Sequence, residues 1–195
     1  MLALLSCGCA PMASAHNPDT SYLRVDIDAA RLRTRLTCDL VTLGKVVALD
    51  DDGDRRISRQ ELDRHLPEIA AFFAANLDVE MTDHAPGLGG LVGVVWPTEM
   101  GESIGEKDYH SAAALISLRF ERPLDDAPED VSVDFRIFGR LGERHTVVGS
   151  FVCGADVTEV TFSRFEPDYE YVTGLRPSPW RRAWRSFWRV FWHGW

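Results

Sequence analysis

Twelve residues, DDDGDRRISRQE from position 50 to position 61, form the most restrictive pattern in the chain. Side-chain oxygens occupy loop positions 1, 3, 5, 9 and 12, at Asp50, Asp52, Asp54, Ser58 and Glu61. Arg56 at position 7 can add its backbone carbonyl. This is the spacing of an EF-hand loop, because calcium prefers six to eight oxygen ligands and a curved chain supplies them from alternate residues. The sequence predicts a calcium site made by these six residues.

One position departs from the pattern. Position 6 of such a loop turns with positive φ and is normally glycine, whereas this chain has Arg55. A non-glycine residue in that conformation costs about 1 kcal/mol or more, and the arginines at 55, 56 and 59 place positive charge near a cation. We therefore expect weak affinity for calcium, with Kd about 10⁻⁴–10⁻³ M. The alternative interpretation is a solvated acidic turn that only caps the next helix.

Helical patterns flank the loop on both sides. Residues 39–48 predict a short entering helix. Ser58 with Glu61 three residues later forms a capping box, which predicts the start of an exiting helix. Its apolar periodicity continues to Leu77. Pro67 is expected to kink or divide that helix, because proline removes a backbone donor.

The rest of the chain predicts short strands. Alternation over residues 21–28 and 31–38 indicates a β-hairpin that turns at 28–30. Further apolar or alternating runs, separated by turn residues, occur at 91–96, 112–120, 131–137, 146–152 and 157–162. Such spacing is typical of an antiparallel, immunoglobulin-like β-sandwich. We expect one mainly β domain over residues 16–175, with a helical EF-hand insertion at about 39–77.

The beginning of the chain has the composition of a targeting segment. Residues 1–15 open on apolar side chains and end in Ala13-Ser14-Ala15, as at a signal-peptide cleavage site. We therefore expect an extracytoplasmic location, in the periplasm or at the cell surface. Two cysteines remain after cleavage, Cys38 and Cys153. In an oxidising compartment they either form one disulfide or stay as two buried thiols.

The C-terminal stretch has the opposite charge to the body. Residues 176–195 contain five arginines and no acid, whereas residues 1–175 contain 16 basic and 30 acidic groups, a balance of −14. Aromatic residues recur every three or four positions over 180–195, opposite the arginines. This predicts an amphipathic helix at a membrane surface or against a membrane domain, or else a helix docked on the domain's own core. The acidic body argues against nucleic-acid binding.

The order of these features resembles one family. A leader ending in Ala15-His16, a strand opening on Ser21-Tyr22-Leu23, the EF-hand-like insertion, a β-rich remainder and an aromatic end are similar to the extracytoplasmic N-terminal region of HupE/UreJ-like bacterial membrane proteins. The resemblance implies a soluble region that precedes a multi-helix membrane domain associated with nickel or cobalt transport. Residues 186–191 look like the segment before its first helix. The transport motif itself is absent from the sequence, so no transport residue is carried over.

No sequence motif of an enzyme is present: the chain lacks a nucleophile elbow, a phosphate-binding Gly-rich loop and a zinc-binding His-Glu-x-x-His. We therefore expect a non-catalytic domain. One alternative is a transition-metal delivery domain, in which His16 at the processed N-terminus offers an amine and an imidazole to nickel or copper. The other is a secreted hydrolase of unknown type.

Overall fold

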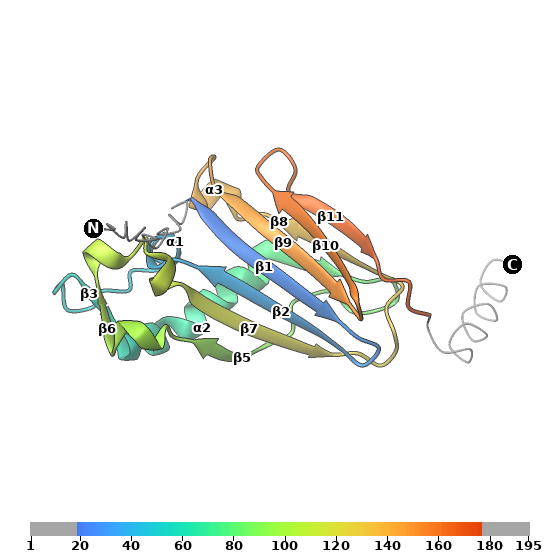
Figure 1. Cartoon of the computed structure of the whole chain (residues 1–195), viewed down its shortest axis with the longest axis horizontal. Coiled ribbons are helices and arrows are strands. Elements are labelled where there is room, and N and C mark those ends of the chain that lie inside the picture. Colours follow the sequence, from blue (N-terminus) through green and yellow to red (C-terminus); the bar gives the residue numbers. More distant parts are fainter. Residues whose placement is uncertain (1–18, 177–195) are drawn as a thin grey trace, which may run out of the picture.

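The computed structural model describes residues 19–176, which are mainly β (Figure 1). The strands are β1 Thr20–Ile27, β2 Arg31–Cys38, β3 Arg56–Ser58, β4 Leu77–Glu80, β5 Gly90–Val95, β6 Ser103–Gly105, β7 Ile116–Pro123, β8 Asp130–Phe135, β9 Thr146–Cys153, β10 Asp156–Phe162 and β11 Asp168–Val172. The α-helices are α1 Leu40–Gly44, α2 Arg59–Asn76 and α3 Phe138–Leu141. Three single-turn 3₁₀ helices lie at Thr98–Met100, Glu106–Asp108 and Ala112–Ala114. The prediction of a mainly β chain is confirmed.

A six-stranded sheet, in the order β10-β9-β1-β2-β7-β5, forms one layer of the domain. The predicted hairpin of β1 and β2 is confirmed, with Asp28 Oδ1 accepting from the backbone N–H of Ala30 (2.8 Å) and of Arg31 (2.9 Å). The expectation of a purely antiparallel arrangement is wrong at one pair, because β1 and β9 run parallel. Parallel neighbours need a long crossover, and here the whole intervening chain makes it, including α2 and the strands β4 and β8 of the second sheet.

The second layer consists of a three-stranded sheet, β11-β8-β4, together with α2. Figure 1 shows β8 and α2 behind the six-stranded sheet. Aromatic contacts join the layers: the rings of Phe135 on β8 and Phe162 on β10 are 4.8 Å apart, and those of Phe151 on β9 and Tyr171 on β11 are stacked at 5.5 Å. Side chains of both sheets and of α2 therefore share one hydrophobic core.

The two helices beside the loop differ from the prediction in length and continuity. Asp39 caps α1, which covers only five residues of the expected 39–48. Of the two alternatives predicted for Pro67, a kink or a division, the division is wrong, because α2 is one helix of 18 residues that contains Pro67. Leu62 before the proline and Ile69 and Phe73 after it are fully buried. Their burial holds both halves of α2 on the same core, which offsets the lost backbone hydrogen bond.

Cys38 and Cys153 are both free thiols, so the disulfide alternative is wrong. Both cysteines lie on strands that neighbour β1. Cys38, at the end of β2, is opposite Ser21 of β1, whereas Cys153, at the end of β9, is opposite Ile27 of β1. Six residues of strand separate these two positions on β1, about 20 Å at the rise of a β-strand. A disulfide requires Cα atoms within about 7 Å. The sheet therefore keeps the two thiols apart.

Several predictions concern residues outside 19–176: the signal peptide at 1–15, the chelating role of His16 and the membrane-surface helix at 180–195. Within the part of the chain that the structure describes, no helix combines the length and the apolar character needed to cross a bilayer.

Candidate metal site

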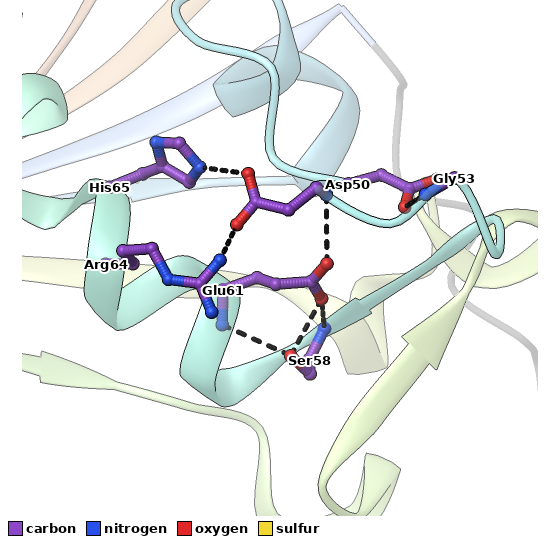
Figure 2. Close-up of polar contacts among 7 residues, drawn as sticks. Asp50, Gly53, Ser58, Glu61, Arg64 and His65 are labelled. Carbon is purple, nitrogen blue, oxygen red and sulfur yellow. Dashed lines mark hydrogen bonds and ion pairs between the residues drawn. The ribbon is translucent and has the colours of Figure 1, made fainter.

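The predicted calcium loop runs from the turn after α1, through β3, into the first turn of α2 (Figure 2). The sharp turn expected at position 6 is confirmed, because Arg55 has φ 62° and Gly53, two residues earlier, has φ 76°. Two left-handed residues close together reverse the chain within a few positions. The backbone between Asp50 and Arg56 therefore curls around its own acidic side chains.

Three of the predicted ligands converge. One carboxylate oxygen from each of Asp50, Asp52 and Asp54 lies within 4.8 Å of the other two. Asp50 is fixed by two backbone donors, since Oδ1 accepts from Gly53 N (2.8 Å) and Oδ2 from Arg55 N (3.0 Å). Figure 2 shows the Asp50 carboxylate turned toward Gly53. The turn that needs positive φ thus also orients the first ligand.

The other two aspartates use the same kind of local bond. Asp52 Oδ1 accepts from Asp54 N at 3.1 Å, and Asp54 Oδ1 accepts from Arg56 N at 2.7 Å. In each case one carboxylate oxygen accepts a hydrogen bond from the backbone N–H two residues later, which is the geometry of an Asx-turn. The second oxygen of each has no such bond to the loop backbone, so a cation that bridges the three aspartates would meet carboxylates already held in place.

Glu61, at position 12, ties the two ends of the loop together. Its Oε1 accepts from Asp51 N (3.0 Å) and its Oε2 from Ser58 N (2.8 Å) and Ser58 Oγ (2.7 Å), while Ser58 Oγ accepts from Glu61 N (3.2 Å). The predicted capping box is therefore confirmed. Glu61 does not join the three converging aspartates. Direct coordination of an ion by Glu61 would require it to exchange some of these bonds.

The loop also contains a short strand pairing that the sequence pattern did not indicate. β3 pairs with β6, and Ile57 lies directly opposite Ile104. Both side chains are buried, at 3% and 1% exposure. Residues 99–108 are polar apart from Met100 and Ile104 and contain glycine, which predicts a loop. This two-stranded ladder fixes the second half of the candidate site.

The ladder also determines where the backbone of Arg56 points. Glu106 N donates to Arg55 O at 3.0 Å. Along antiparallel strands, every second residue forms backbone hydrogen bonds with the partner strand. Because Arg55 forms such a bond, the N–H and C=O of the next residue, Arg56, face away from β6. The N–H faces Asp54, as its hydrogen bond shows, and the carbonyl shares that edge. The guanidinium instead bonds Ser103 Oγ through Nη2 (2.7 Å). Arg56 thus turns its carbonyl to the edge that faces Asp54, while its guanidinium is held by Ser103.

The pKa values of Tyr109 and Glu61 are shifted by their surroundings at the loop. Burial raises the pKa of Tyr109, and the charges of Asp50, Glu106 and Asp54 raise it further. For Glu61, burial favours a higher pKa, but the hydrogen bonds from Ser58 and from Asp51 N, together with the charge of Arg64, leave the pKa below its ordinary value. Glu61 is therefore ionised at neutral pH. Its contribution to stability is present above its unfolded-state pKa and is lost as the pH falls through its lowered pKa.

Asp51, at loop position 2, contacts α2 and is not one of the three converging aspartates. Its Oδ1 lies 2.8 Å from His65 Nε2, and its Oδ2 forms an ion pair with Arg64. These contacts join the loop to the second turn of α2. No sequence pattern predicts them, because they depend on how the helix leaves the loop. Both carboxylate oxygens of Asp51 are therefore engaged by side chains of α2.

All six predicted ligands lie around the loop, although only three converge. A hollow of about 260 Å³ is lined by five of them, namely Asp52, Asp54, Arg56, Ser58 and Glu61, and Asp50 completes the aspartate group. Every donor is an oxygen, from carboxylate, hydroxyl or carbonyl groups. Oxygen donors suit a hard cation such as calcium, whereas zinc and copper favour imidazole or thiolate.

No protein-family model matches the chain, and no curated protein matches it either.

Proposed function

We propose that residues 50–61 bind calcium and that the domain is a non-catalytic calcium-binding module. The observation that supports this most is the convergence of carboxylate oxygens from Asp50, Asp52 and Asp54 within 4.8 Å, in a loop whose spacing fits calcium ligation. The carbonyl of Arg56 and the hydroxyl of Ser58 add oxygens of the same kind. Three carboxylates so close repel one another, and a divalent cation removes that repulsion.

The bound ion would stabilise the helical part against the sheets. The loop connects α1 to α2, and α2 contributes Leu62, Ile69 and Phe73 to the core. An ion that binds only the folded loop adds its binding free energy to the stability of the domain. We therefore assign calcium a structural role. Arg55 and its positive φ keep the affinity in the weak range, which suits an extracytoplasmic compartment where calcium is abundant.

We further propose that this module is the extracytoplasmic part of a HupE/UreJ-like membrane protein, held at the membrane by residues 180–195. The support is the composition of the sequence: an apolar leader, the acidic body and an arginine- and tryptophan-rich end. In this proposal the two layers form an immunoglobulin-like sandwich, and α1, the loop and α2 are its EF-hand insertion.

Calcium should raise the melting temperature of the protein. With Kd about 10⁻⁴–10⁻³ M and 10 mM calcium, the gain is about 1.5–3 kcal/mol, or about 3–10 °C for a chain of this size. Asp52→Asn should abolish most of this shift, because it removes one converging carboxylate. Differential scanning calorimetry with and without calcium, at constant ionic strength, measures it.

Asp51→Asn is the matched control, since it removes the same charge from the neighbouring position, whose carboxylate faces Arg64 and His65. This variant should keep the calcium shift. Equal shifts in both variants would mean that calcium acts on general surface charge, and the absence of any shift in the unaltered protein would disprove the metal proposal.

A further inference from the structure

Two arginines on the exposed face of the six-stranded sheet lie directly opposite each other. Arg35 on β2 pairs with Arg119 on β7, and both are exposed. Leu124 N donates to Ala30 O at 2.8 Å, and this bond sets the alternation along the two strands. In this alternation, Arg35 and Arg119 are a pair without backbone hydrogen bonds between them, and in such pairs the two side chains are closer than in hydrogen-bonded pairs. Like charges in that position destabilise a sheet.

The nearest acids are already engaged by other arginines. Asp26 accepts three hydrogen bonds from Arg24 at 2.7–3.0 Å. Glu121 lies 3.5 Å from Arg31 and 3.6 Å from Arg33. These contacts hold both carboxylates toward their own partners. The charges of the opposed arginines are thus not balanced by the acids beside them.

Among residues 19–176, neither Arg35 nor Arg119 has an ion pair or a side-chain hydrogen bond. The Arg119 guanidinium lies over Gly93 on the adjacent strand β5, since a Cβ at position 93 would be 2.7 Å from Arg119 Nη2. A hollow of about 160 Å³ opens here, and Arg35, Arg119 and Val92 are among the residues that line it. Because Gly93 has no side chain, the Arg119 guanidinium can lie at this hollow without a steric clash.

We propose that Arg35 and Arg119 form a binding site for a small oxyanion, such as phosphate or a carboxylate. Guanidinium groups present paired N–H donors that match the oxygens of these anions, and a single anion between them would remove their mutual repulsion. The hollow has room for one compact anion. The acids at positions 26 and 121, which also line it, disfavour ligands with charge spread over a larger area. The site is independent of the calcium loop.

Inorganic phosphate is the probe, compared with chloride at the same ionic strength in calcium-free buffer. We expect 10 mM phosphate to raise the melting temperature by a few degrees more than chloride. The extra shift should fall by at least half in Arg35→Gln and in Arg119→Gln, and disappear in the double variant. Without phosphate, each single variant should melt no lower than the unaltered protein, because one of two opposed charges is gone.

Arg144→Gln is the matched control, because Arg144 is another exposed arginine, in the turn before β9, and it should keep the full phosphate shift. Gly93→Ala tests the geometry without changing charge, since the added methyl group displaces the Arg119 guanidinium and should weaken phosphate binding. Phosphate also stabilises proteins non-specifically through exclusion from their surface. An equal phosphate shift in the double variant, or none beyond chloride in the unaltered protein, overturns the proposal.

Discussion

Replacing Phe73 with alanine is expected to lower the free energy of unfolding by about 3–5 kcal/mol, the range for removing a fully buried phenylalanine. Phe73 is fully buried and belongs to the core that joins α2 to the sheets. The change leaves a cavity at the end of the helix that carries Ser58 and Glu61 at its start. Equilibrium unfolding in urea, followed by circular dichroism, measures the loss.

Phe72→Ala is the control, because the neighbouring side chain has the same chemistry and is only partly buried. The two rings form an edge-to-face contact with centroids 5.3 Å apart, so both variants lose that contact. Apart from the loss of that contact, Phe72→Ala should lower the free energy of unfolding by only about 1 kcal/mol, because Phe72 is less buried than Phe73. Similar losses in the two variants would contradict the position of α2 on the core.

Acid is expected to destabilise the protein through His145. The side chain is 1% exposed. Its Nε2 lies 3.0 Å from Ser21 Oγ, and its buried Nδ1 has no hydrogen-bond partner among the described residues. Burial and, to a smaller extent, the charge of Lys45 lower the pKa of His145 from 6.5 to about 4, although the charges of Asp19 and Asp39 oppose the shift. The neutral imidazole is therefore the form that the fold accommodates.

The folded pKa is the lower one, so the stability linked to His145 is complete above pH 6.5 and declines as the pH falls from 6.5 to 4. There the unfolded chain binds a proton that the folded chain excludes. The loss should reach about 2.5 kcal/mol at pH 4.5. His145→Gln removes the titrating group, so its loss of stability between pH 7 and pH 4.5 should be smaller by that amount. A variant with an undiminished loss would show that other groups cause the acid sensitivity.

The elements that could be predicted from the sequence are those specified by neighbouring residues. Alternation of period two and the Asp28 turn determine the hairpin of β1 and β2. The start of α2 follows from Ser58 and Glu61, whose side chains bond each other's backbone. The positive φ at Arg55 followed from its place in the loop pattern. In each case the cause and the structure lie within about ten residues.

The features that the sequence did not indicate depend on distant partners. The parallel pairing of β1 with β9 joins Thr20 to Thr146, and no local pattern selects that neighbour. β6 and β11 were missed because three residues around Ile104, and the acidic and aromatic residues 168–172, become strands only beside β3 and β8. The continuity of α2 through Pro67 likewise depends on the core beneath it.

For the candidate site, the spacing predicted the residues but not the contacts of each one. The convergence of Asp50, Asp52 and Asp54 follows from alternation within a tight loop. The spacing predicted the bonds between Glu61 and Ser58 but not the bond from Asp51 N to Glu61. It also could not show whether Glu61 caps the helix or ligates an ion, because the capping box and metal ligation call for the same glutamate.

The most direct test of calcium binding is an NMR titration of ¹⁵N-labelled protein. The amides of Gly53, Arg55 and Arg56 donate to the carboxylates of Asp50 and Asp54, so an ion at those carboxylates must change their shifts. We predict saturable shifts of these three amides, with one common Kd of about 10⁻⁴–10⁻³ M, and much smaller shifts on the far side of the sheets. If these amides do not move, or move only in proportion to ionic strength, the loop does not bind calcium.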